Sequence, residues 1–373
     1  MDKHLHIVAH DVPWPADYGG AIDVFYKIKA LHALGVKVHL HCFTGSRKPQ
    51  KELEQYCVSV QYYSRKRKLA AFSLKVPYIV QSRRDVQLLK DLSNDQYPIL
   101  LDCIHCTYLL HTNQLKDRKV FVRPQNVEYR YYNQLAKHET NIVKKIYFAW
   151  ESRLLKGYER SIANKAVFWP LNQQDLKTYQ EEFGAKRADF LPAFVGWDAI
   201  DGLPDKGCFC LYQGNLSINE NEKAADWLLN HVFNNLEIPF VVAGKDPSLP
   251  LQTLAHSHAQ SCMVINPSNA DMEDMVRKAQ VNIIPSFNET GVKLKLLHAL
   301  FHGRHCLVNP QAVAGSGLET LCHIATTEQE FKKEISRLFD IPFTASMRAQ
   351  RMDVLKSLYN NEQNARQLIA WIY

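Results

Sequence analysis

Several features common in other protein classes are scarce in this chain of 373 residues. No apolar run approaches the roughly 20 residues that a membrane-spanning helix needs, and residues 1–14 indicate a strand, not a signal peptide. The nine cysteines form no paired framework and mostly lie in apolar runs, which favours a reducing cytosol. Cys103 and Cys106 have the spacing of metal ligands, but their apolar surroundings favour half-buried strand residues.

Two binding motifs are also missing. The first strand is not followed by G-x-G-x-x-G, which argues against a nicotinamide-dependent enzyme. Cations and aromatics are not interleaved along a strand, so we expect no nucleic-acid partner. A net charge of +7 remains to be explained, and it suits a phosphorylated small molecule or an anionic membrane.

Part of that charge precedes an apolar segment. Arg65–Lys68 are consecutive cations, and Phe72, Leu74 and Tyr78 follow them. Basic residues beside apolar ones are typical of surfaces that dock on anionic lipid. The alternative interpretation is a solvated loop.

Short apolar runs alternate with longer amphipathic ones along the chain. We expect strands over 4–10, 36–43, 98–106, 119–124 and 166–170, with helices over 19–35 and 142–165. Gly, Pro and Asp gather in 184–207, which indicates a connection, and the alternation then restarts. The fold class is therefore α/β, with two doubly wound parallel sheets that face each other across a cleft. The predicted domains are 1–190 and 191–349, with a terminal helix over about 350–373 that packs back on the first.

Ligands of such sheets bind at the carboxyl ends of the strands, so the loops 10–20, 212–221 and 285–293 matter most. The third loop leads into a helix predicted to start near Gly291. Lys293 interrupts its apolar face, and Lys293 and Lys295 both lie at the positive end of its dipole, where cations are unfavourable. A bound anion would explain both lysines. The alternative is that Lys293 lies in the loop, solvated.

Ordered motifs along nearly the whole chain resemble those of the GT-B-fold glycosyltransferases, closest to the retaining group 1, or family 4, enzymes. In chain order the matching segments are PWPADYGG (13–20), NVE (126–128), YER (158–160), Gly214, Leu216 and Asn221, Ala243 and Gly244, Pro285, and Gly291, Lys293 and Lys295. Each motif alone is weak, but the set occurs in order with its spacing intact.

The resemblance implies two Rossmann-like domains, an acceptor-side N-terminal domain and a C-terminal domain that binds a nucleotide-diphosphate sugar. It implies a metal-independent retaining glycosyltransferase that needs no cofactor and helps to build a cell-surface polysaccharide. Its partners would be the nucleotide-sugar donor, a glycan or lipid-linked acceptor and an anionic membrane surface, which Arg65–Lys68 would contact. We expect a cytoplasmic protein, peripheral on the inner face of the membrane.

The resemblance also implies the site residues. Lys293, Lys295, His105 and His10 are the catalytic candidates, although the family register favours Thr107 over His105. The candidates for donor binding are Gly19, Gly20, Gly214, Asn215, Lys245, Thr290, Gly291, Val292 and His298. Thr290 and His298 stand where many relatives carry glutamates, and Asn215 and Asn221 lie in a loop where many relatives carry Arg and Lys. For Glu128 and Glu159 a helix-anchoring role is expected.

Two alternatives within this fold remain open. A GT-B sugar-nucleotide epimerase would share the architecture and the nucleotide site. The departures at Thr290, His298, Asn215 and Asn221 also fit a binding protein on a catalytically degenerate transferase fold.

Overall fold

The computed structural model of the chain describes residues 2–373 and divides into two compact units. The first unit extends to Gly196 and includes Thr290–Val292 and Tyr359–Tyr373, and the second comprises Trp197–Glu289 and Lys293–Leu358. The terminal helical region thus splits. α14 (Ala345–Leu358) belongs to the second unit, and only α15 (Asn361–Ile372) packs against α1 of the first.

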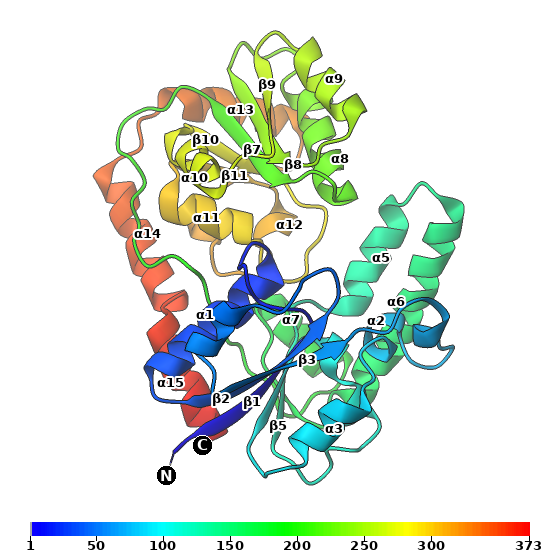
Figure 1. Cartoon of the computed structure of the whole chain (residues 1–373). Coiled ribbons are helices and arrows are strands. Elements are labelled where there is room, and N and C mark those ends of the chain that lie inside the picture. Colours follow the sequence, from blue (N-terminus) through cyan, green and yellow to red (C-terminus); the bar gives the residue numbers. More distant parts are fainter. Residues whose placement is uncertain (1) are drawn as a thin grey trace. The chain divides into compact units, whose positions relative to one another are not determined.

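The first unit contains a six-stranded, wholly parallel sheet (Figure 1). Its strands are β1 (His4–Ala9), β2 (Lys37–Thr44), β3 (Ser59–Ser64), β4 (Ile99–Asp102), β5 (Val120–Arg123) and β6 (Val167–Phe168). The helices are α1 (Gly19–Ala33), α2 (Tyr78–Gln81), α3 (Val86–Leu92), α4 (Tyr108–His111), α5 (Glu128–His138), α6 (Ile142–Ile162), α7 (Gln173–Lys177) and α15. The central strands are buried throughout because helices cover both faces of a parallel sheet.

The second unit contains another six-stranded parallel sheet. Its strands are β7 (Cys210–Asn215), β8 (Phe240–Lys245), β9 (Ser261–Ile265), β10 (Val281–Ile284), β11 (His305–Val308) and β12 (His323–Ile324). The helices are α8 (Asn219–Trp227), α9 (Leu249–Ser257), α10 (Asn269–Lys278), α11 (Leu294–His302), α12 (Pro310–Val313), α13 (Glu328–Asp340) and α14.

Both sheets have the same strand order. The first runs β3-β2-β1-β4-β5-β6, and the second, read from its opposite edge, runs β9-β8-β7-β10-β11-β12. Successive strands are therefore added in opposite directions across the sheet on either side of the β1–β4 pair, and likewise on either side of the β7–β10 pair in the second sheet. Loops diverge at such switch points, and the space that they leave is where doubly wound sheets bind ligands.

Two consecutive helices, α5 and α6, follow β5. Ile142 and Ile146 at the start of α6 are exposed, although apolar residues spaced four apart on a helix usually face a core. Further along α6, the buried carboxylate of Glu159 accepts hydrogen bonds from the backbone N–H groups of Glu128 and Tyr129 and so caps α5.

Among residues 2–373, none of the helices combines the length and apolarity needed to cross a bilayer.

A network of four charged side chains lies buried beneath the first switch point. Arg123 at the end of β5 donates to both carboxylate oxygens of Asp23 on α1, each at 2.8 Å. Lys27, one turn later on α1, contacts both Asp23 and Asp102, the last residue of β4. Burial alone would raise the pKa of Asp23, but Arg123 and Lys27 hold it well below its ordinary range.

Arg123 also reaches the segment that leaves the sheet. Its guanidinium donates to the carbonyls of Leu191 and Pro192, and the Asp23 carboxylate accepts the N–H of Phe194. One helix, two strands and the outgoing chain therefore converge on one set of ions. Removing a single partner from such a set leaves an uncompensated buried charge.

Replacing Arg123 with Met should therefore destabilise the first unit by about 3–5 kcal/mol. The matched control is Arg366→Met, which removes an exposed ion pair with Glu362 and should cost less than about 0.5 kcal/mol. Calorimetric unfolding of both variants measures the difference. Equal melting temperatures for the two variants would contradict the structural role of the network.

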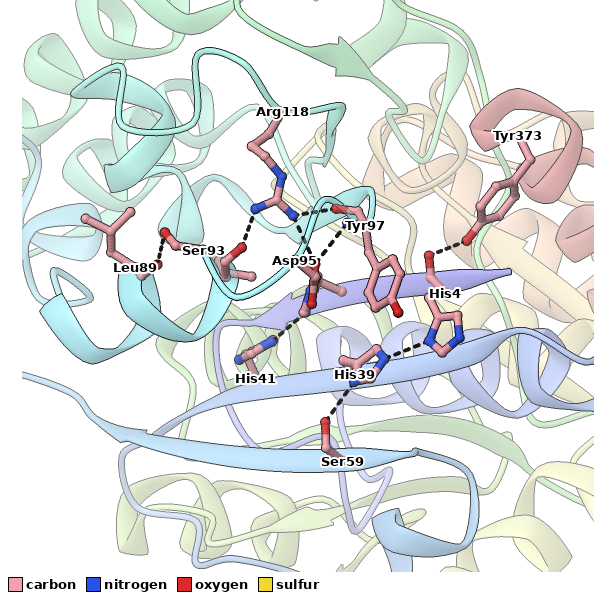
Figure 2. Close-up of polar contacts among 12 residues, drawn as sticks. His4, His39, His41, Ser59, Leu89, Ser93, Asp95, Tyr97, Arg118 and Tyr373 are labelled. Carbon is pink, nitrogen blue, oxygen red and sulfur yellow. Dashed lines mark hydrogen bonds and ion pairs between the residues drawn. The ribbon is translucent and has the colours of Figure 1, made fainter. Parts of the chain in front are cut away.

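Histidines gather at the opposite end of the same sheet, where β1 and β2 begin (Figure 2). His4 Nδ1 lies 3.0 Å from His39 Nε2, and His6 Nδ1 lies 2.9 Å from His41 Nε2. The second pair continues to Asp95, which His6 contacts at 3.0 Å. Burial lowers the pKa of His41 to about 3, so that imidazole is neutral at physiological pH.

Candidate functional site

The first switch point brings together His10 and His105. His10 directly follows β1 and His105 lies in the turn after β4, and their ring centroids are 5.3 Å apart in an edge-to-face arrangement. Burial and neighbouring groups, Arg83 among them, hold the pKa of both imidazoles well below the ordinary value. Two neutral imidazoles can each accept a proton or a hydrogen bond.

The geometry favours His105 over Thr107 as the functional side chain of this turn. Thr107 is fully buried, and its hydroxyl bonds to the Ile104 carbonyl at 2.7 Å and the Tyr158 hydroxyl at 2.8 Å. His105 remains partly exposed. Cys103, just before it, adopts φ 85°, a left-handed conformation that non-glycine residues rarely adopt and that often marks functional sites.

Glu128 approaches the same place from the start of α5. Its Oε1 lies 3.5 Å from His105 Nε2, and burial raises its pKa to about 7. Cys103, His105 and Glu128 offer three ligand atoms within 4.8 Å of one another, a set of types that Zn²⁺ accepts. Two observations oppose a metal here: burial raises the pKa of the Cys103 thiol well above its ordinary value, and the Arg83 cation lies near.

The two adjacent glycines have different roles in this geometry. Gly19 is exposed and begins α1. A Cβ on Gly20 would lie 2.8 Å from His10 Cε1, so the second glycine makes room for the imidazole. The first switch point therefore places two histidines next to an uncapped helix start, since Tyr18 provides no side-chain cap for α1. We call His10 and His105 the histidine pair.

The second switch point brings together Gly214, Asn215, Lys295 and His298. Lys295 Nζ donates to Asn221 Oδ1 at 3.0 Å and lies 5.0 Å from the ring centroid of Tyr212, a β7 residue. Burial lowers the pKa of Lys295 to about 8. A desolvated ammonium held by one amide and one aromatic ring is positioned to pair with an anion.

α11 begins at Leu294, three residues later than predicted, so Lys293 is its N-cap and the lysine lies at the loop end. No described side chain caps α11, and its first turn holds no acidic residue. By contrast, Ser248, Ser268 and Thr327 cap α9, α10 and α13. The helix start at the switch point thus keeps backbone N–H groups that an anion could accept.

His298 is not a plain surface residue. It stacks on Trp197 at 5.1 Å with an interplanar angle of 14°, and its Nδ1 lies 3.5 Å from the Gln213 amide. Burial lowers its pKa to about 4, so the ring is neutral. The polar face that the sequence predicted for α11 is largely buried too, since Ala299 and His302 are both enclosed.

Lys245 and Thr290–Val292 complete the predicted set. Lys245 ends β8 in register with Asn215, with its side chain exposed. Thr290–Val292 cluster with the first unit, where the Gly291 N–H donates to Asp175 and its carbonyl accepts from Asn172, both at 2.9 Å. The Gly291 amide is therefore held by a carboxylate in this structure.

Sequence reasoning overlooked several residues of the site. Tyr212 and Gln213 begin the predicted loop 212–221, but neither was singled out, because a tyrosine and a glutamine give a weak signal there. Arg83 was overlooked because it stands alone, although its Nε donates to the His10 carbonyl at 2.9 Å. Trp197 was assigned to the connection, and only the structure places its ring against His298.

The second glycine of the Ala243–Gly244 motif has a packing role that can be tested. A Cβ on Gly244 would lie 2.0 Å from the Gly214 carbonyl oxygen, so Gly244→Ala should force β7 and β8 apart and cost about 1–3 kcal/mol. Gly157 of α6 is the control: nothing lies within 4 Å of its Cβ position, and Gly157→Ala should stabilise by about 1 kcal/mol. Thermal unfolding that shows the same sign for both variants would refute the close approach.

Comparisons with known proteins agree with this geometry. Residues 208–340 match the family described as glycosyl transferases group 1. A Klebsiella pneumoniae protein described as an uncharacterised 44.6 kDa protein in the cps region is 25% identical over 369 residues, covering 91% of this chain and 93% of that protein.

Two solved structures show the fold. Sucrose-phosphate synthase from Thermosynechococcus elongatus superposes with a TM-score of 0.71 at 13% identity, covering 99% of this chain and 98% of that chain. WaaG, a glycosyltransferase involved in lipopolysaccharide biosynthesis, gives 0.67 at 12% identity with 99% of each chain covered. The chain has the GT-B fold, with two Rossmann-like domains, and its resemblance to group 1 glycosyltransferases is confirmed.

Proposed function

We propose that this chain, with its GT-B fold and group 1 match, is a retaining glycosyltransferase that moves a sugar from a nucleotide-diphosphate donor to a glycan or lipid-linked acceptor. Breaking the bond between sugar and diphosphate develops negative charge on the leaving group. The observation that carries the proposal is Lys295, desolvated at the second switch point and followed by no acidic side chain in the first turn of α11. The similarity to a cps-region protein supports a role in cell-surface polysaccharide synthesis.

In this proposal the donor diphosphate binds at Lys295 and at the start of α11, with Lys293 adding a second cation. Gly214, Asn215 and Lys245 border the same edge of the second sheet. His298 and Trp197 present a stacked pair of rings to the nucleoside. The proposed transfer needs no metal ion, because ammonium and amide groups offset the charge that develops on the diphosphate.

On the first unit, the neutral imidazoles of His10 and His105 are the candidates to orient an acceptor hydroxyl and accept its proton. Glu128, with its pKa raised to about 7, lies within 3.5 Å of His105 and can stabilise the imidazolium that forms. A transferase needs such a base because the acceptor oxygen loses its proton when it bonds to the sugar.

The epimerase alternative predicts a different outcome from the same assay. A transferase releases nucleoside diphosphate only when an acceptor is present, whereas an epimerase interconverts the sugar nucleotide without one. The match to group 1 glycosyl transferases supports transfer.

Binding of UDP, GDP, ADP and dTDP tests the donor site directly. At least one nucleotide should bind, and Lys293→Ala with Lys295→Ala should weaken it by over a hundredfold, since two charge-assisted contacts are lost at about 1.5 kcal/mol or more each. The control is Lys333→Ala with Lys356→Ala, two exposed lysines of the same unit, which should leave affinity within twofold. Calorimetric titration measures all three proteins, and equal losses in both double variants would rule out the site.

The depressed pKa of Lys295 gives the binding a pH dependence. Only the ammonium form pairs with the diphosphate, and with a pKa of about 8 that form falls roughly tenfold between pH 7 and pH 9. Affinity should therefore decline by about that factor as pH rises. Lys295→Arg, which stays charged, should show a flat profile. A flat profile for the unaltered chain would show that Lys295 does not titrate at the ligand.

A further inference from the structure

Two segments of the first unit expose large apolar side chains together. One is the loop 64–78 between β3 and α2, and the other, residues 137–149, forms the turn between α5 and α6 with the start of α6 (Figure 1). Their exposed apolar side chains range from 52% to 89% exposure: Phe72, Ile146, Ile142, Leu74, Val143 and Leu69. We call these two segments the apolar-basic surface.

The apolar-basic surface is also the source of the chain's net charge. Residues 64–78 contain five Lys and Arg residues and no Asp or Glu. Residues 137–149 contain three Lys residues and one Glu. Together they carry +7, which equals the charge of the whole chain. The rest of the protein is therefore balanced, and the excess of cations is confined to the place where apolar side chains protrude.

The loop 64–78 contacts α6 directly after the second segment ends. Phe72 of the loop stacks on Trp150 of α6 with ring centroids 5.8 Å apart. The buried Glu151 carboxylate accepts the backbone N–H of Tyr78 at 3.0 Å and so caps α2 from α6. These contacts fix the loop against the hairpin.

Local geometry arranges apolar and basic groups side by side. Ile142, Val143 and Ile146 occupy one flank of the first turns of α6, and Lys144 and Lys145 adjoin them. In the loop, Lys68–Ala71 forms a short 3-10 turn that presents Leu69 with Arg67 and Lys68 beside it. Side chains with apolar tips among cations are those that enter the boundary between headgroups and acyl chains.

We propose that the apolar-basic surface docks the protein on an anionic lipid bilayer. Exposed Leu, Ile and Phe side chains gain free energy when they leave water, and each cation near an anionic leaflet adds attraction. A second copy of this chain fits less well, because a symmetric pairing would place seven net positive charges against seven. The sequence located the basic half at Arg65–Lys68, and the structure adds the helical hairpin.

The apolar-basic surface is linked to His10 through α2 and Arg83. Arg83, which follows α2, donates from its guanidinium to the Ile79 carbonyl at 2.8 Å and from Nε to the His10 carbonyl at 2.9 Å. A lipid-linked acceptor would therefore reach His10 and His105 beside the membrane. The role of the acceptor rests on the proposed function, whereas lipid binding does not.

Co-sedimentation with vesicles of phosphatidylglycerol and phosphatidylcholine tests docking. The full chain should bind these vesicles at least tenfold more strongly than vesicles of phosphatidylcholine alone. The triple variant Ile142→Ser, Val143→Ser, Ile146→Ser should lose at least tenfold in partitioning. Lys144→Glu with Lys145→Glu should lose at least tenfold at low salt, with less effect at high salt.

Matched controls alter the second unit. Leu249→Ser, Ile265→Ser, Ile324→Ser removes three other exposed apolar side chains, and Lys333→Glu with Lys356→Glu makes the same change in net charge. Both should retain binding within twofold. Thermal unfolding checks that each variant remains folded.

Retained binding in the triple variant, or equal loss in its control, would overturn the proposal. So would a hairpin variant that keeps vesicle binding but abolishes self-association in sedimentation velocity, because the surface would then pair two copies. Nucleotide affinity, measured without vesicles, separates the transferase proposal from the docking proposal. Lipid binding without nucleotide binding would contradict the transferase proposal and leave the docking proposal supported.

Discussion

The first unit depends on a buried set of four charges, Asp23, Lys27, Asp102 and Arg123. Its members come from the helix after β1 and from the ends of β4 and β5, next to the segments that carry His10 and His105. Asp23 lies one helical turn after Gly19 and Gly20, and Asp102 immediately precedes Cys103. The network therefore holds the two loops of the switch point in place, so the neutral histidines His10 and His105 are not needed for that structural role.

In the second unit, neutral side chains position the residues of the switch point. Lys295 is positioned by Asn221 and Tyr212, and Asn221 also donates to the Asn215 carbonyl at 2.9 Å. The hydrogen-bond partners of Lys295 are neutral, and the nearby Glu220 carboxylate only partly offsets the effect of burial on its pKa. In contrast, Lys27 and Arg123 of the first unit are paired directly with carboxylates. This difference in pairing is why we assign the anionic donor to the second unit.

Sequence patterns predicted the elements with regular periodicity. Alternating apolar runs gave two parallel sheets, and the rule for doubly wound folds drew attention to the loop that begins with His10. His105 had been placed inside a strand but lies in the turn after β4, and Lys295 lies in the first turn of α11. The buried network could not be predicted, because charged residues in amphipathic runs look solvated until their partners from distant segments are known. The exposed start of α6 could not be predicted either, because helical periodicity shows which residues share a face but not what covers that face.

The site residues show the same division. The position of Lys295 followed from helix periodicity, which is local. The choice of His105 over Thr107 depended on the hydroxyl of Tyr158, fifty-one residues away in the chain, and the stacking of His298 depended on Trp197. Such contacts arise from tertiary packing, which carries no local signal.

The histidines at the amino-terminal end of the first sheet set an acid limit for the molecule. His41 is buried and neutral with a pKa of about 3, whereas in an unfolded chain it titrates near 6.5. Below about pH 6.5 the unfolded chain takes up a proton that the native sheet refuses, and the native state loses roughly 1.4 kcal/mol per pH unit down to the native pKa. Acidification would therefore lower the stability of the first unit through histidines at the end of the sheet opposite His10 and His105.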